Sequence, residues 1–214
     1  MAAEKLFAED MELKSGEERY PRSSILHPQV SKHWTLAETA GRLVEISASR
    51  AAASLTLAFG LVRDAQQRGE PVGWVMSQGS FFYPPDVARG GVDLKSLAVV
   101  RVPESRAISR AGEKLLRSGA FGLVVLDIGN ADIAMPLQSR LAGLARQHHA
   151  ALLCLTAKEP GRFSLGSLVS LRVHARRVRT SENQFACELK VLKDKRRGPT
   201  WSEMEVCNEP AGLC

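Results

Sequence analysis

The chain has 214 residues, of which 44% are hydrophobic and 24% are charged, so we expect one globular domain with a full core. It has no run of about 18 apolar residues and no secretory apolar region near the N-terminus, so we expect a cytoplasmic protein without a membrane span. Its cysteines show neither a C-x-x-C motif nor a zinc spacing, which favours a reducing compartment and no metal site; they are Cys154, Cys187, Cys207 and Cys214.

The net charge of +6 is unevenly distributed along the chain. Residues 1–19 hold six acids and three bases, whereas residues 172–197 hold nine Lys or Arg and three acids. A basic C-terminal region indicates a nucleic acid or an acidic protein as partner. A solvated sheet edge guarded by Lys and Arg gives the same pattern, so both interpretations stay open.

In chain order, residues 1–30 are expected to form an arm and a linker, residues 31–206 a core, and residues 207–214 a tail. The core begins with a strand that includes Leu43, Val44 and Ile46. A helix follows, and its apolar residues recur at steps of three and four on one face: Leu55, Ala58, Phe59, Val62 and Ala65.

Strands and helices alternate after this first unit. Further strands are predicted at 72–76, 97–102, 123–128 and 151–156, and helices at 86–89, 104–117 and 136–147. This alternation is typical of a parallel sheet covered by helices on both faces. Three segments near the C-terminus instead alternate polar and apolar residues and predict an antiparallel extension of the sheet: 167–178, 184–192 and 201–206.

The loop between the first strand and its helix lies where P-loop proteins bind phosphate through the motif G-x-x-x-x-G-K-[ST]. Here the eight residues read ASRAAASL, and Ser49 follows directly after the first motif position. Ala48 and Ala53 stand for the glycines, Ser54 for the lysine, and Leu55 for the hydroxyl that binds Mg²⁺. The segment is therefore either a degenerate nucleotide loop or an Ala/Ser-rich helix start that never bound phosphate.

Taken in this order, residues 42–206 resemble the ATPase core of the RecA recombinase family. The stretch FGLVVLDIGN, with Asp127, is similar to Walker B, and Gly91-Val92-Asp93 is similar to a family turn. The C-terminal segments resemble the family's terminal hairpin, including a K-x-K at Lys193 and Lys195. The resemblance implies a RecA-like three-layer α/β fold, with a mostly parallel central sheet, helices on both faces and an antiparallel C-terminal extension.

The departures from the family pattern predict that hydrolysis is lost. Besides the missing Walker A residues, Gln78 stands at the position of the catalytic glutamate and cannot act as a base. We therefore expect no enzyme activity, no catalytic residue and no cofactor. The two long DNA-binding insertions of recombinases, after residues 128 and 156, are also short here, so at most weak DNA binding is expected.

Two non-hydrolysing branches of this superfamily fit, and the ImuA family of mutagenesis proteins fits better than the SulA family of division inhibitors. ImuA-like identity implies an adaptor in DNA-damage-induced translesion synthesis (SOS mutagenesis) that binds RecA and an ImuB-like polymerase homologue. The C-terminal residues expected to bind a partner are Lys190, Lys193, Lys195, Arg196, Arg197 and Trp201. Trp201 is an interface anchor on this interpretation and a sheet-packing residue on the alternative one.

Three other functions stay open. A SulA-like protein would bind the division protein FtsZ, with the loop Phe81-Phe82-Tyr83 either exposed for this contact or buried under the sheet. A weak DNA-binding module would use the basic residues of 172–197 and would lose affinity with salt. Residual ATPase activity is the third of these alternatives, since a helix N-terminus attracts anions and could still bind a nucleotide. His148 and His149 are expected to favour a helix C-terminus and not to bind a metal.

Overall fold

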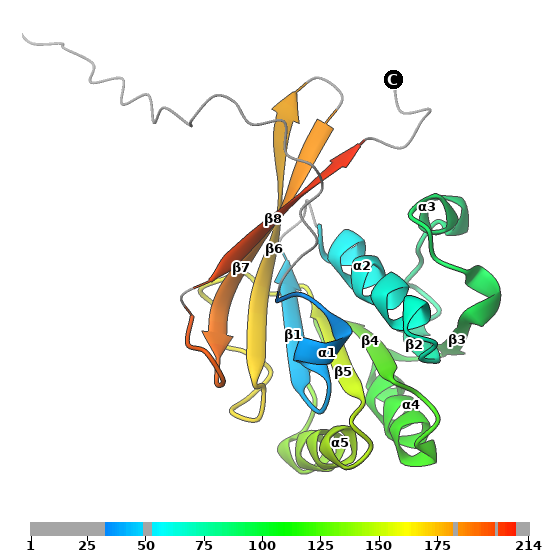
Figure 1. Ribbon diagram of the computed structural model, residues 1–214. Helices are drawn as coiled ribbons and strands as arrows, with labels where there is room; N and C mark the ends of the chain where they lie inside the picture. Colours follow the sequence, from blue (N-terminus) through cyan, green and yellow to red (C-terminus); the bar gives the residue numbers. More distant parts are fainter. Residues whose placement is uncertain (1–32, 49–52, 182–183, 200, 209–214) are drawn as a thin grey trace, which may run out of the picture.

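The computed structural model describes residues 33–48, 53–181, 184–199 and 201–208, so the N-terminal arm, Ser49 and most of the tail lie outside the described residues. Its centre is an eight-stranded sheet with the order β3-β2-β4-β5-β1-β6-β7-β8 (Figure 1). The parallel strands are β1 (Leu43–Ala48), β2 (Val72–Ser77), β3 (Leu97–Val102), β4 (Leu123–Gly129), β5 (Ala151–Thr156) and β6 (Leu171–Ser181). β7 (Gln184–Asp194) and β8 (Ser202–Asn208) add to this sheet in antiparallel orientation.

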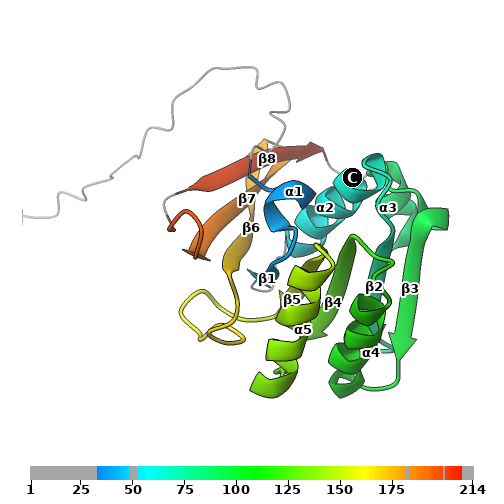
Figure 2. The ribbon, with the colours of Figure 1, turned by 60° about the horizontal axis from the view of Figure 1, so that its bottom comes forward.

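Helices cover both faces of the sheet and create two hydrophobic cores. α1 (Leu36–Thr39), α2 (Ser54–Gln67) and α3 (Pro84–Arg89) pack on one face, and the 3₁₀ turn at Leu94–Ser96 follows them. α4 (Ser105–Ser118) and α5 (Met135–Gln147) lie side by side on the opposite face (Figure 2). The predicted α/β fold, with helices on both faces and an antiparallel C-terminal extension, is confirmed.

The buried stripe of α2 differs from the predicted one. Leu57 and Leu61 face the core, while Leu55 and Phe59 are only partly buried. The Phe59 ring stacks on Trp74 of β2 with a centroid distance of 4.6 Å, so it packs at the flank of the helix contact. The face of α2 that contacts the core therefore includes more positions than the sequence pattern predicted.

The strand predicted at 167–178 begins later, at Leu171. The residues before it belong to the segment 157–170, called here the β5–β6 loop, which packs against the sheet through Leu165 and Val169. No helix of the described residues is long and apolar enough to cross a membrane.

A buried ion pair joins the start of β1 to the antiparallel extension. Arg42 Nη2 lies 2.6 Å from Asp194 Oδ1, and Arg42 also donates to the hydroxyl and carbonyl oxygens of Ser170, each at 2.9 Å. Asp194 accepts hydrogen bonds from Trp201 Nε1 at 3.0 Å and from the amide of Arg196 at 2.9 Å. Burial lowers the pKa of Arg42, whereas for Asp194 burial is outweighed by these hydrogen bonds, which lower its pKa. These contacts connect the antiparallel extension to β1 at the centre of the sheet.

Candidate functional site

A pocket of about 490 Å³ opens at the carboxyl ends of the central parallel strands. Open α/β sheets bind their ligands at this edge. The end of β1, the start of α2, the loop after β2 and the ends of β4 and β5 supply its walls: Ala48, Ser54, Leu55, Ser80, Phe81, Asp127, Gly129, Asn130, Leu155, Thr156, Ala157 and Glu159. The described ends of the degenerate loop, Ala48, Ser54 and Leu55, therefore line the same cavity as the Walker B-like acid.

Four of the residues predicted for the nucleotide loop line this pocket, namely Ala48, Ser54, Leu55 and Asp127. Ala53 is fully buried in the core below α2, with φ −73° and ψ 2°, so this position does not use the positive φ that glycine permits. Gln78 is exposed and does not line the pocket, and its backbone N–H donates to Val102 O at 3.0 Å.

The ionisable residues among the described lining are both acids, Asp127 and Glu159. Burial raises the pKa of Asp127, and a hydrogen bond with the Ser80 hydroxyl opposes this rise. Lys158 precedes Glu159 in sequence, but its Nζ binds Asp132 Oδ1 at 2.7 Å and it does not line the pocket. The described wall of the cavity is therefore negatively charged when both acids are ionised.

Glu159 was missed by the sequence analysis, as was a second acid beneath the pocket, Glu45. Glu45 is fully buried in β1 and accepts hydrogen bonds from Thr156 Oγ1 at 3.1 Å, Ser164 Oγ at 2.5 Å and the Leu165 amide at 3.1 Å. Arg172 Nε lies 3.6 Å from its carboxylate. An acid within the apolar run LVEISA was the signal that could have indicated such a site.

This buried network holds the β5–β6 loop on the sheet. Arg172 Nη1 donates to the carbonyl oxygen of Arg162 at 2.8 Å, and Glu45 binds the next part of the loop. Phe163, between these anchors, is 95% exposed. The loop therefore has fixed flanks and presents an aromatic side chain to solvent.

The loop after β2 is also partly anchored. Phe82 contacts Phe59 and Trp74 with centroid distances of 5.1 and 5.5 Å. Its neighbours Phe81 and Tyr83 are 79% and 63% exposed, and Phe81 lines the pocket. Two residues of this aromatic triplet are thus exposed, while Phe82 is partly buried against Phe59 and Trp74.

The predicted partner-binding cations mostly contact the chain itself. Lys193 and Lys195 donate to Ser167 O at 3.4 and 2.6 Å, and Arg197 pairs with Glu38 at 2.8 Å. Arg196 donates to the carbonyl oxygens of Glu38 and Ala40 at 3.3 and 3.4 Å. These contacts attach the extension to α1 and to the β5–β6 loop.

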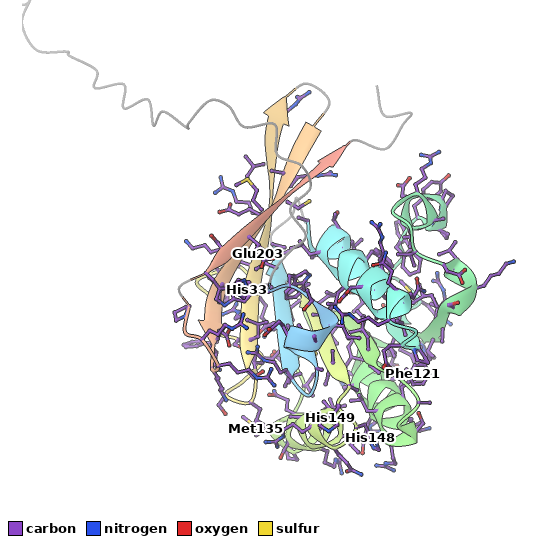
Figure 3. The ribbon with its side chains drawn as sticks, viewed as in Figure 1. His33, Phe121, Met135, His148, His149 and Glu203 are labelled. Atoms are coloured by element: carbon purple, nitrogen blue, oxygen red, sulfur yellow. The ribbon has the colours of Figure 1, made fainter. Side chains whose placement is uncertain are left out.

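Lys190 and Trp201 complete the predicted partner-binding set. Lys190 is exposed on β7. Trp201 is partly buried, and its ring lies 5.3 Å from that of His33, which in turn pairs with Glu203 at 3.3 Å (Figure 3). The partner-binding role of this set stays a prediction.

Histidines of the described residues form no metal site. His148 caps α5 and His149 follows with φ 53°, and Figure 3 shows both at this helix end. Among the residues that the structure places, no three His, Cys, Asp or Glu side chains are grouped to hold a metal ion.

Comparison with known proteins supports the fold and part of the sequence resemblance. No protein-family profile matches the chain. The RecA proteins of Clostridium botulinum strains Eklund 17B and Alaska E43 are each 31% identical to it over 88 residues. The chain is distantly related to RecA. The matched segment comprises 41% of this chain and spans only 24% of the length of these RecA proteins.

The crystal structure of the RadB recombinase shares the fold of this RecA-like chain. It superposes with a TM-score of 0.59 and 14% sequence identity over 80% of this chain and 92% of that one. The RecA-like fold that the sequence predicted is therefore confirmed.

Proposed function

We propose that this chain is a RecA-like adaptor that does not hydrolyse nucleotide and acts by binding other proteins. The observation that carries the proposal is the chemistry of the pocket, which has Ser54 and Leu55 at the lysine and hydroxyl positions and acids as its described ionisable residues. Phosphoryl transfer depends on positive charge around the phosphates.

We further propose that the adaptor works in DNA-damage-induced translesion synthesis, with RecA and an ImuB-like polymerase homologue as partners. The ImuA resemblance supports this choice, and so does the distant relationship to RecA, because recombinase protomers stack through the same fold. DNA itself is at most a weak ligand on this proposal, since most of the C-terminal cations contact the chain.

Absence of hydrolysis is tested by phosphate release from Mg²⁺-ATP, with a RecA protein as positive control. We expect no release above background from the wild type and no change in Asp127→Asn. Release that this substitution abolishes would overturn the non-enzymatic proposal.

The partners are tested by affinity capture from DNA-damaged cells. Truncation after Leu192 is unsuitable, because it removes β8 and also Asp194, the buried partner of Arg42. The charge reversal Lys190→Glu changes an exposed residue of the predicted set, and Lys114→Glu on the exposed side of α4 is its matched control. We expect wild type and control to recover RecA and the polymerase homologue, and Lys190→Glu to recover less of the latter. Equal recovery by all three proteins would remove Lys190 from the partner surface.

A SulA-like division inhibitor is the second candidate, and the exposure of Phe81 and Tyr83 favours it. On this reading, overexpression causes filamentation, the double variant Phe81→Ala/Tyr83→Ala prevents it, and the capture experiment recovers FtsZ in place of RecA.

A further inference from the structure

We propose that the pocket at the carboxyl edge of the sheet receives a guanidinium group, the side chain of an arginine presented by a protein partner. The inference rests on the adaptor function proposed above and names the chemistry that one partner must offer. The proposed ligand is a cation, whereas a nucleotide-binding pocket at this place would bind an anion.

Two acidic residues line the cavity, one on a strand and one in the loop after the neighbouring strand. Asp127 belongs to β4, and Glu159 follows β5, which pairs with β4. Among the described lining residues there is no Lys or Arg that neutralises them. The pKa of Asp127 is raised by burial, as expected of a carboxylate that has lost water without gaining a cation. A cation in the pocket would supply the missing partner.

The α2 N-terminus in the pocket wall, at Ser54, favours an anion instead, and the relative charges decide between the two. A helix dipole is equivalent to roughly half a positive charge at the N-terminus. Asp127 and Glu159 together carry two formal negative charges when ionised. The net field of the described walls therefore attracts cations.

The volume of the pocket and its aromatic lining residue favour arginine over other cations. A volume of about 490 Å³ is in the range of small-molecule sites and far exceeds the space that a bare metal ion needs. Phe81, which lines the cavity and is 79% exposed, offers a ring face. A planar guanidinium stacks on aromatic rings and binds a carboxylate through two parallel hydrogen bonds, whereas an ammonium group is a more strongly hydrated point charge.

The test is a titration of the full chain with N-acetyl-arginine methylamide, followed by amide NMR shifts. Capped lysine and capped citrulline are the comparison probes, because citrulline keeps the shape of arginine without its charge. We expect saturable shifts at pocket residues such as Gly129 and Asn130, with a Kd on the order of millimolar for one side chain, and at least about tenfold weaker binding of citrulline.

Variants assign the site. Asp127→Asn and Glu159→Gln are each expected to weaken arginine binding about tenfold or more, whereas Glu104→Gln, an exposed acid that follows β3 outside the pocket, should not change it. Equal binding of citrulline, or no saturable shift at about 50 mM arginine, would overturn the proposal.

The same variants separate this inference from the adaptor function. Recovery of partners by wild type and by Asp127→Asn alike would leave the adaptor standing and overturn the pocket as its receptor. Loss of capture in Asp127→Asn and Glu159→Gln, with Glu104→Gln unaffected, would support both. Mg²⁺-dependent ATP turnover would overturn the adaptor function, whereas ATP shifting the same amides more tightly than arginine, without turnover, would overturn the arginine pocket alone.

Discussion

Removing the carboxylate of Asp194 should be among the most damaging single changes in this chain. Asp194→Ala leaves the guanidinium of Arg42, whose side chain is only 3% exposed, in the interior without its anion. The indole N–H of Trp201 and the amide of Arg196 lose an acceptor at the same time. The substitution therefore breaks one ion pair and two hydrogen bonds.

The expected loss is about 3–5 kcal/mol in the free energy of unfolding, because breaking one side of a buried pair leaves an uncompensated charge. An exposed pair with similar geometry is the matched control. Arg197 and Glu38 are 2.8 Å apart with side chains 39% and 31% exposed, and such pairs contribute about 0.2–1 kcal/mol. Arg197→Ala should thus cost several-fold less than Asp194→Ala.

Urea denaturation followed by circular dichroism measures both losses in one two-state scheme. The double variant Arg42→Met/Asp194→Leu tests the cause, since it removes both charges and should cost less than the sum of the single changes. If Asp194→Ala costs under about 1 kcal/mol, or no more than Arg197→Ala, the reasoning from burial is refuted.

Three further predictions follow from other contacts. Because folding lowers the pKa of Asp194, its carboxylate contributes stability above the ordinary aspartate pKa of about 3.9, and this stability is lost as pH falls through the lower folded value. The melting temperature of Asp194→Asn should therefore fall less steeply with decreasing pH in the acid range than that of the wild type. An equally steep fall would contradict this. Glu45→Gln should speed amide hydrogen exchange in the β5–β6 loop, measured by mass spectrometry, whereas exchange unchanged from wild type would mean that the network does not hold the loop. Gly112→Ala should lower the free energy of unfolding by about 1–3 kcal/mol, because the new Cβ would lie 2.5 Å from the buried side chain of Leu126. Gly143→Ala, whose Cβ would have nothing within 4 Å, should raise it by about 0.4–1 kcal/mol. Urea denaturation measures both changes, and equal effects of the two substitutions would refute the packing argument.

Local pattern was sufficient to predict the parallel strands. β4 and β5 are mostly apolar runs, and each is followed or preceded by a helix with regular apolar spacing. The type of each element and the order of the elements can therefore be predicted from short stretches of sequence. The end of β1 and Asp127 lie at the same edge of the sheet because the carboxyl ends of parallel strands share one edge.

Long-range pairing was beyond such patterns. Arg42 and Asp194 are 152 residues apart, and nothing close to either indicates the other. Composition left open whether the C-terminal lysines and arginines form a partner surface or a solvated sheet edge, because it counts charges without showing contacts such as that of Lys195 with Ser167 O. Glu45 was missed because its hydrogen-bond partners lie more than a hundred residues away.

The place of β1 in the sheet also constrains how the chain is made. β1 is the first strand of the described residues, yet its two described neighbours in the sheet are β5 and β6, and Leu43 pairs with Leu152. At about 5–20 residues per second, translation leaves this apolar strand without its neighbours for roughly 5–20 s. During that interval, Glu45 puts a charge in the middle of a segment that would otherwise associate with other nascent strands. We therefore expect Glu45, which holds the β5–β6 loop in the folded protein, also to limit aggregation of the unfinished chain on the ribosome.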